Sequence, residues 1–195
     1  SSESPAPGGG SIAAYIGSLG VSLGTMVANL SSHKKGWDDR WEEFSTWAEK
    51  GQQYKDELLR LVDADTKAFN DIMSAMGLPK GTDEEKKIRK QAIQDATRKA
   101  IEIPFKVMQT AYSSMEVIKA MAENGNPNSI SDAGVGALCA RSAVIGAFLN
   151  VRINAAGYDN KKLVEDIIAE GKEIESKAIA LESEILKIVN TKIVS

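Results

Sequence analysis

The sequence PGGGS at positions 7–11 leads into IAAYIGSLGVSLGTMVANL at positions 12–30, and this stretch decides how the chain folds. No charged residue occurs in positions 12–30, although small polar residues lower the hydropathy of the segment. Gly17, Gly20 and Gly24 are spaced three and four residues apart, so they share a helix face that another helix can approach closely. We therefore predict a helix buried in a soluble bundle rather than a membrane span.

The triple glycine leaves the backbone N–H groups of Gly8, Gly9 and Gly10 free of side chains, so a ligand or a second backbone can come close. Ser11 is a favourable N-cap for the helix that follows, and the N-terminus of a helix attracts anions. These four residues are candidate ligand-binding residues at the end of an extended segment over residues 1–10. The alternative is a flexible linker joined to a capped helix.

The composition is that of a globular chain without a nucleic-acid signature. Of its 195 residues, 43% are hydrophobic, and the net charge is −3. This length fits one domain, residues 1–195, and the acidic balance argues against general nucleic-acid binding. A single cysteine, Cys139, forms no internal disulfide and defines no metal site, so we expect a reducing, cytoplasmic location.

Helical patterns follow one another along the chain, and no run alternates apolar and polar residues as a half-buried strand would. Thr82 and Glu85 form a predicted capping box, Pro104 is expected to kink a helix or begin a new one, and Gly51 to interrupt another. These signals predict an all-α bundle of about six to seven helices. The expected ranges are 12–30, 38–76, 83–102, 104–123, 132–156 and 161–189.

Two of these segments, 12–30 and 133–154, are more apolar than a surface helix should be. A helix that is apolar on all sides has to be buried on all sides, and a chain of this size cannot easily surround two such helices. Their small residues favour close helix pairs. We therefore predict a homodimer or a higher oligomer whose subunits share this surface.

Asp65 is the candidate catalytic residue. The apolar stripe of the second helix contains Leu61 and Phe69, and position 65 falls between them on the same face. A carboxylate inside an apolar stripe is costly unless it is paired or used, and a shielded carboxylate can both accept and donate a proton. The alternative is a structural ion pair, for which Arg141 and Arg152 are the possible partners.

The loop 124–132 is dense in short polar side chains, and Ser131 or Asp132 is expected to cap the next helix. Asp132 with nearby amides could instead bind a polar heterocycle. His33 beside Lys34 and Lys35 is better explained by a solvated turn than by a catalytic base. No Walker or zinc-binding pattern is present.

Several motifs carry a family resemblance that none of them would carry alone. They occur in the expected order over nearly the whole chain, at residues 5–11, 19–20, 26–30, 61–69, 78–80, 125–134 and 149–154. Together they resemble the cyclodeaminase/cyclohydrolase family of folate enzymes. This family includes the C-terminal domain of the bifunctional formiminotransferase-cyclodeaminases and stand-alone methenyltetrahydrofolate cyclohydrolases.

The resemblance implies an all-α fold, dimeric subunits and a folate site at a subunit interface. It assigns the acid/base role to Asp65 and makes a tetrahydrofolate derivative the substrate, with no metal and no prosthetic group. Basic residues would bind the anionic glutamate tail, and Asp132 would accept hydrogen bonds from the pterin ring. The implied substrate-binding residues are Gly8, Gly9, Gly10, Ser11, Lys34, Lys35, Asp132, Asn150 and Arg152.

Three functions in folate one-carbon metabolism follow from these observations. The first is formimidoyltetrahydrofolate cyclodeaminase, which converts 5-formiminotetrahydrofolate to 5,10-methenyltetrahydrofolate and ammonia. The second is methenyltetrahydrofolate cyclohydrolase, which opens the same ring with water. The third is a non-catalytic helical dimer that scaffolds a folate enzyme. For the first function we expect a formiminotransferase domain or partner, and for all three no nucleic-acid or membrane partner.

Overall fold

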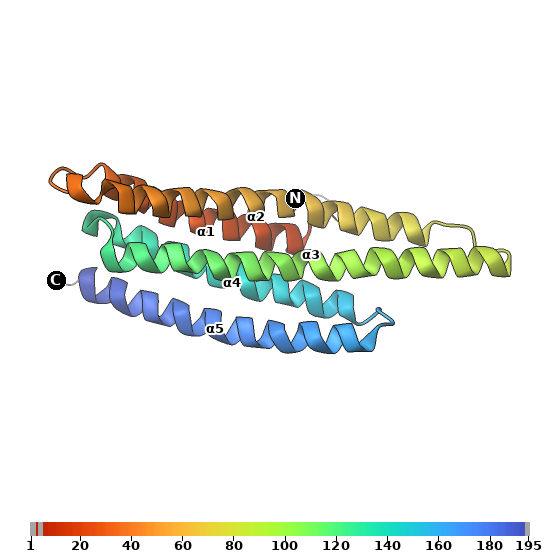
Figure 1. Cartoon of the computed structure of the whole chain (residues 1–195). Helices are drawn as coiled ribbons and strands as arrows, with labels where there is room; N and C mark the ends of the chain where they lie inside the picture. Colours follow the sequence, from red (N-terminus) through yellow and green to blue (C-terminus); the bar gives the residue numbers. More distant parts are fainter. Residues whose placement is uncertain (1–2, 4–5, 194–195) are drawn as a thin grey trace.

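The computed structural model describes residue 3 and residues 6–193, which form five α-helices and no strand (Figure 1). The helices are α1 (Gly9–Ser32), α2 (Trp41–Met76), α3 (Asp83–Asn124), α4 (Ile130–Ala155) and α5 (Lys161–Ile193). Two short 3₁₀ turns, η1 (Asp38–Arg40) and η2 (Pro127–Ser129), precede α2 and α4. The all-α prediction is confirmed. Residues 1–2, 4–5 and 194–195 of the predicted domain, including Pro5 of the first motif, lie outside the described residues.

Consecutive helices run side by side in opposite directions along one axis (Figure 1). Helix α4 packs against α1, α3 and α5, and α1 packs against α2, α3 and α4. The α2–α3 hairpin extends beyond the other helices, whereas α1 begins midway along the bundle (Figure 1). The start of α1 therefore lies against the middle of its neighbours rather than at an end of the molecule.

The prediction of six to seven helices is wrong, because the expected interruptions do not occur. Gly51 lies inside α2, and the missing side chain lets α1 approach: a Cβ on Gly51 would lie 3.3 Å from the Cβ of Thr25. Pro104 lies inside α3, which continues through it to Asn124. Segments expected as two helices on either side of the proline are thus one helix.

Asn154 of α4 compensates for the proline in α3. A proline has no N–H, so the carbonyl of Ala100, four residues before Pro104, loses its donor within the helix. The Nδ2 of Asn154 donates a hydrogen bond to this carbonyl at 2.7 Å. A side chain from a neighbouring helix therefore replaces the missing backbone hydrogen bond and ties α3 to α4.

One of the three capping predictions is confirmed. The Thr82 hydroxyl accepts from the Glu85 N–H at 3.2 Å, and the Glu85 carboxylate accepts from the Thr82 N–H at 2.9 Å. Ser11 is not an N-cap, because α1 already begins at Gly9, so Gly9 and Gly10 are helical rather than extended. Ser131 and Asp132 are not N-caps either, since α4 begins before them, directly after η2.

Helices α1 and α4 approach closely because two glycines face each other. A Cβ on Gly20 would lie 2.8 Å from the carbonyl oxygen of Gly136, and a Cβ on Gly136 would lie 2.8 Å from the carbonyl oxygen of Gly20. A side chain at either position would force the two backbones apart. The close pairing expected from the small residues is therefore present within one chain.

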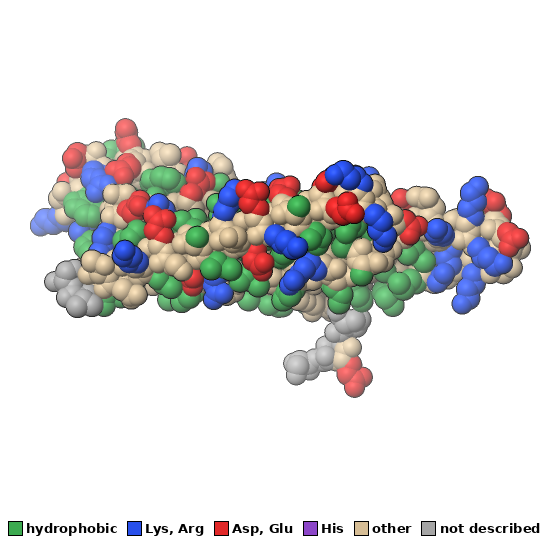
Figure 2. Space-filling view, turned by 90° about the horizontal axis from the view of Figure 1, so that it is seen from below, with side chains coloured by type: hydrophobic (Ala, Val, Ile, Leu, Met, Phe, Trp, Pro, Cys, Tyr) green, Lys and Arg blue, Asp and Glu red, His purple; other side chains and the backbone are tan. Residues whose placement is uncertain are grey.

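The single chain does not bury these two helices on all sides, since each has an exposed apolar face, as expected if one chain cannot surround both. The exposed residues of α1 are all uncharged: Gly9, Ile12, Tyr15, Leu19, Met26, Asn29 and Leu30. The exposed large apolar residues of α4 are Val135, Leu138, Leu149 and Ile153. Seen from below, the molecule has hydrophobic side chains along its lower edge, while acidic and basic side chains are interspersed above them (Figure 2).

Two segments are long and apolar enough to cross a membrane, Gly9–Ser32 and Pro127–Ala155, each with a mean hydropathy of 1.5 in its most apolar window. Within the bundle, 61% and 50% of the residues in these windows are buried. The core helix of a helical bundle has the same length and composition. The close contact between Gly20 and Gly136 fits that explanation.

Candidate functional site

A cavity of about 230 Å³ lies where the start of α1 meets α2, α3 and the last turns of α4. Four helices converge there, so its wall combines residues that are far apart in the sequence. The wall consists of Ala6, Gly8, Gly9, Gly10, Asp65, Thr66, Ala68, Phe69, Ile72, Ala100, Asn150 and Asn154. Polar and apolar groups contribute about equally to this wall, and convergent polar groups beside apolar side chains are found in small-molecule sites.

Asp65 is half-buried on α2 and faces the first turn of α1. Its Oδ2 accepts a hydrogen bond from the Ser11 hydroxyl at 2.8 Å. A Cβ on Gly10 would lie 2.6 Å from the Cγ of Asp65, so the carboxylate fills the space that a larger residue at position 10 would occupy. The glycines therefore make room for a carboxylate of the protein itself.

Neither arginine considered as a structural partner pairs with Asp65. The Nε of Arg141 lies 3.3 Å from the Oε1 of Glu182 on α5, and the guanidinium of Arg152 lies 4.9 Å from the centre of the Phe148 ring. Within residue 3 and residues 6–193, Asp65 forms no ion pair, and its hydrogen-bond donor is a serine. This favours a carboxylate available for chemistry over a structural ion pair.

The opposite wall of the cavity carries two carboxamides, one helical turn apart on α4. The Nδ2 of Asn150 donates to the Gly146 carbonyl at 2.9 Å, and the Nδ2 of Asn154 donates to the Ala100 carbonyl at 2.7 Å. Because a carbonyl oxygen only accepts, these contacts fix which amide atom faces the backbone and leave each Oδ1 as an acceptor. With Asp65, they make the cavity rich in acceptors, which suits a ligand that carries N–H donors.

The structure brings together Asp65, Asn150 and the predicted glycines 8–10 in the cavity wall, with Ser11 behind Asp65. Sequence reasoning missed Thr66 and Asn154, which also line the cavity. Thr66 follows Asp65 directly and gives no separate signal. For Asn154 the signal is Pro104, because a proline inside a helix leaves a carbonyl that needs a donor from elsewhere.

The basic turn lies far from the cavity. His33 is the C-cap of α1, and Lys34 and Lys35 follow it. The 24 residues of α1 separate this turn from Gly8, a distance of about 36 Å at 1.5 Å per residue. The Nζ of Lys34 lies 3.9 Å from the centre of the Trp37 ring. Within one chain, neither lysine reaches the cavity.

Asp132 and Arg152 also lie outside the cavity wall. Asp132 is in the first turn of α4, about 27 Å along the helix from Asn150. Arg152 is exposed and lines an open surface depression with Leu149, Asn150 and Ile153, so that of these residues only Asn150 also borders the cavity. Within one chain, Lys34, Lys35 and Asp132 therefore lie away from the cavity and Arg152 lies beside it, whereas the neutral residues expected to bind a folate line the cavity or adjoin it.

No group of three or more His, Cys, Asp or Glu side chains is arranged to hold a metal ion in the part of the chain that the structure describes. Cys139 is half-buried on α4, and burial raises the pKa of its thiol above the ordinary value. A raised pKa lowers the thiolate fraction, so this cysteine is a weak nucleophile at neutral pH.

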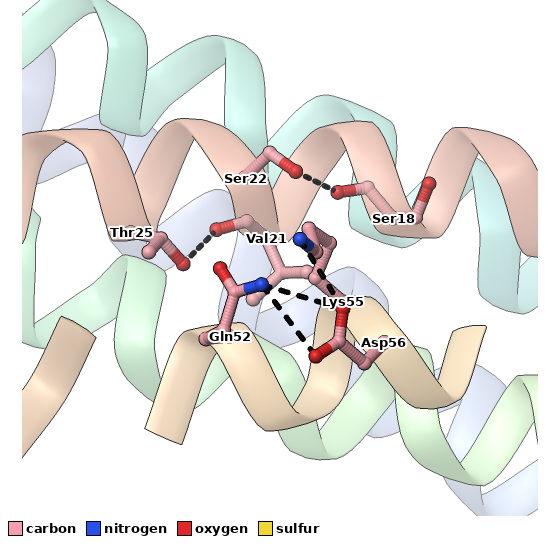
Figure 3. A network of polar contacts seen from close by, with 7 residues as sticks. All are labelled: Ser18, Val21, Ser22, Thr25, Gln52, Lys55 and Asp56. Carbon is pink, nitrogen blue, oxygen red and sulfur yellow. Dashed lines mark hydrogen bonds and ion pairs between the residues drawn. The ribbon is translucent and has the colours of Figure 1, made fainter. Parts of the chain in front are cut away.

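A second, more open groove of about 460 Å³ lies between α1 and α2. Figure 3 shows that the hydroxyls of Ser22 and Thr25 donate to carbonyls of their own helix at 2.7 and 2.8 Å. On α2, Gln52 and Lys55 both contact the carboxylate of Asp56. These four polar side chains are already paired, whereas the cavity at Asp65 combines a carboxylate with two amides, which makes it the stronger candidate for a catalytic site.

The fold and the cavity define an all-α protein in which a carboxylate faces two acceptor amides at the meeting of four helices. The chain belongs to the formiminotransferase-cyclodeaminase family, whose model matches residues 1–173. The resemblance identified from the motifs is therefore confirmed, and the family works in folate one-carbon chemistry.

Two relatives and one solved structure illustrate the family. A methenyltetrahydrofolate cyclohydrolase of Methylorubrum extorquens is 36% identical over 98% of this chain and 92% of its own length. A formimidoyltransferase-cyclodeaminase of Gallus gallus is 36% identical over 92% of this chain, which spans 34% of that relative. The crystal structure of a formiminotetrahydrofolate cyclodeaminase from Thermotoga maritima has a TM-score of 0.85 at 24% identity, over 98% of this chain and 92% of that one. This last likeness shows the fold.

Proposed function

We propose that the chain is a formimidoyltetrahydrofolate cyclodeaminase with Asp65 as its acid and base. The observation that carries the proposal is the Asp65 carboxylate, which lines the cavity and has one oxygen held by Ser11. A carboxylate with a defined orientation, beside acceptor amides and an aromatic ring, is suited to proton transfer on a bound heterocycle.

The chemistry requires one group that first takes and then gives a proton. In 5-formiminotetrahydrofolate, N10 attacks the formimino carbon on N5 and closes a five-membered ring through a tetrahedral aminal. Asp65 accepts the proton that N10 loses and donates a proton to the departing nitrogen, which leaves as ammonia. The 5,10-methenyl product is a cation, so the carboxylate also stabilises the charge that develops on it. The reaction requires no prosthetic group.

In this proposal, the wall that carries Asn150 and Asn154 recognises the substrate. The Oδ1 atoms of Asn150 and Asn154 accept hydrogen bonds from N–H groups of the substrate, because their amide nitrogens are already bonded to backbone carbonyls. Phe69 and Ile72 line the same cavity and offer apolar contact to a planar ring.

Methenyltetrahydrofolate cyclohydrolase is the second candidate. The specific observation in its favour is the relative from Methylorubrum extorquens, which carries that name and aligns over 92% of its own length. Water would add to the carbon that bridges N5 and N10, and Asp65 would accept a proton from that water. The same cavity and the same carboxylate therefore serve either reaction.

A cyclodeaminase needs a source of 5-formiminotetrahydrofolate. The Gallus gallus relative is named for both a formimidoyltransferase and a cyclodeaminase activity. We therefore propose a formiminotransferase domain or partner that supplies the substrate, in the cytoplasm, with no part played by nucleic acid or membrane.

The test measures the methenyl absorbance and ammonia together after 5-formiminotetrahydrofolate is mixed with the protein. Matched rises in both, abolished in Asp65→Asn and retained in a control at the exposed Asp63, Asp63→Asn, support the cyclodeaminase. If neither rises while methenyltetrahydrofolate is lost faster than in buffer, the chain is a cyclohydrolase. If the protein reacts with neither substrate, the remaining function is that of a non-catalytic scaffold.

We also propose that two copies pair through the exposed face of α1. A helix face in contact with water normally carries charged residues, yet every exposed residue of α1 is uncharged. Positions 12, 15, 19, 22, 26, 29 and 33 are separated alternately by three and four residues, the spacing of a helix that packs along another helix. A second copy offers the same stripe, as a two-fold interface requires.

Antiparallel pairing of the two α1 helices would also complete the site. The cavity of about 230 Å³ is smaller than the roughly 300–1,000 Å³ of most ligand pockets, so a folate would extend out of it. The start of one antiparallel helix lies beside the end of the other. In this arrangement, the partner's Lys34 and the partner's Lys35 approach Gly8 and Gly9 and bind the anionic tail of the substrate.

Leu19→Arg tests the pairing by placing a charge in the middle of the stripe. Leu59→Arg on α2 is the matched control, because Leu59 and Leu19 are 40% and 44% exposed. In analytical ultracentrifugation we expect a dimer for the unmodified chain and for the control, and a monomer for Leu19→Arg. A monomeric unmodified chain, or a dimer that survives Leu19→Arg, would contradict this interface.

A further inference from the structure

We infer that Ser11 is a positioning residue: together with Thr66 it holds the Oδ2 of Asp65, so that Oδ1 is the oxygen that exchanges protons. The role of Oδ1 in proton exchange rests on the proposed function. The hydrogen bonds among Ser11, Thr66 and Asp65 are observed independently of that function.

Ser11 is 1% exposed and lies behind Asp65 rather than in the cavity wall. Its hydroxyl donates to the Oδ2 of Asp65 at 2.8 Å and lies 3.1 Å from the Oγ1 of Thr66. A hydroxyl has a single proton, and Ser11 gives its proton to the carboxylate, so Thr66 is the donor of the second hydrogen bond. The two hydroxyls form a chain that ends on one carboxylate oxygen.

The other buried or half-buried hydroxyls of α1 behave differently. Ser18, Ser22, Thr25 and Ser31 donate to carbonyls three or four residues earlier in their own helix. Two of these contacts are visible in Figure 3. Ser11 lies in the first turn of α1, where the helix has no turn before it to accept such a bond. Its hydroxyl is directed to α2 instead.

The two oxygens of a carboxylate exchange places when the side chain rotates about its Cβ–Cγ bond. Ser11 opposes this rotation by binding Oδ2, and the whole carboxylate lies against Gly10, with Oδ1 nearest to the position that a Cβ on Gly10 would occupy. Oδ1 is then the oxygen that remains for a substrate proton. A hydrogen bond to a charged group is worth enough that its loss should slow turnover by about 10- to 100-fold.

Ser11→Ala is the test, with Ser18→Ala as the matched control, because Ser18 is also buried on α1 but bonds to its own helix. We expect kcat to fall by about 10- to 100-fold in Ser11→Ala, with KM nearly unchanged, and no change in the control. Thr66→Val should lower kcat less than Ser11→Ala does. Thr66→Ser keeps the hydroxyl and should have the kcat of the unmodified chain. An active enzyme in which Ser11→Ala has an unchanged kcat would overturn the inference.

A measurement without substrate separates this inference from the proposed function. In a double-mutant cycle of Ser11→Ala and Asp65→Ala by urea denaturation, the two changes should be coupled, because each removes one partner of the hydrogen bond between Ser11 and Asp65. Strict additivity overturns the positioning role even if the chain is an enzyme. Coupling in a chain that converts neither folate keeps the positioning role and removes only the proposed function.

Discussion

The two walls of the cavity are built in opposite ways. On one wall, Asp65 lies against the bare backbone of Gly10 and receives a hydrogen bond from Ser11. On the other wall, Asn150 and Asn154 direct their amide nitrogens to backbone carbonyls and hold neutral acceptors in place. The first wall carries the carboxylate that we propose exchanges a proton, whereas the second is fixed by hydrogen bonds to backbone carbonyls.

Gly9 and Gly10 show the difference most directly, because they are consecutive on α1 and face different walls. A Cβ on Gly10 would lie 2.6 Å from the Cγ of Asp65, a contact that no side chain can make without displacement. A Cβ on Gly9 would lie 3.3 Å from the Nδ2 of Asn150, which a small shift relieves. The wall that carries the charge therefore tolerates less change than the wall that carries the amides.

Asp65→Asn should give the largest effect, because a carboxamide has the same shape but cannot take up and release a proton as a carboxylate does. We expect kcat to fall by about 10²- to 10⁴-fold, with little change in thermal stability. Steady-state kinetics and a melting curve measure the two quantities. A variant that keeps more than a tenth of the original kcat would show that this wall is not the catalytic one.

Gly10→Ala and Gly9→Ala form the next comparison. Overpacking at position 10 should lower the free energy of unfolding by about 1–3 kcal/mol and reduce activity strongly, since Asp65 is displaced. Gly9→Ala should cost less than about 1 kcal/mol and leave most of the activity. Urea denaturation and kinetics on both variants test this order. Equal losses would mean that the two walls are equally rigid.

Asn154→Ala should have a smaller effect on turnover and a measurable effect on stability. It leaves the Ala100 carbonyl without a donor, which costs about 1–3 kcal/mol. Pro104→Ala supplies a backbone N–H to the same carbonyl, so the cost of Asn154→Ala should shrink in that background. A double-mutant cycle by denaturation measures this coupling, and strict additivity of the two changes would contradict the proposed compensation.

Tyr54 lies outside both walls and should give the smallest effect. Its hydroxyl donates to Glu116 at 2.5 Å, and burial together with Glu116 raises the pKa of Tyr54 from 10.0 to about 12. The folded state holds this proton more tightly than the unfolded state, so the stabilisation is complete below pH 10 and is lost as the pH rises to about 12. Tyr54→Phe should lack this pH-dependent loss in denaturation experiments and keep full activity at neutral pH.

The helical character of the chain could be predicted from periodicity, and the capping box at Thr82 from its spacing. The continuity of α3 could not be predicted, because it depends on an amide that Asn154 brings from another helix. The start of α1 differs from the prediction for a related reason. Ser11 looks like an N-cap locally, but its hydroxyl is used by Asp65 of α2.

Some residues of the candidate site could likewise be placed from the sequence, and others could not. The place of Asp65 in the cavity wall was predictable because a charge interrupts an apolar stripe, and the place of the glycine motif was predictable because bare backbone permits close approach. Lys34 and Lys35 were grouped with them by a resemblance along the chain. The length of α1 keeps them apart within one subunit. The distance between these lysines and the glycine motif follows from the sequence only once α1 is known to be one unbroken helix.

The bond between Asn154 and the Ala100 carbonyl has a consequence for how this chain can change over generations. A lineage that replaces Asn154 while it keeps Pro104 passes through a form with an unsatisfied carbonyl inside the bundle. A lineage that replaces Pro104 first restores an ordinary helical hydrogen bond to the Ala100 carbonyl, so that position 154 no longer has to supply a donor. Substitutions at these two positions are therefore expected to occur in a preferred order, with the proline lost before the asparagine.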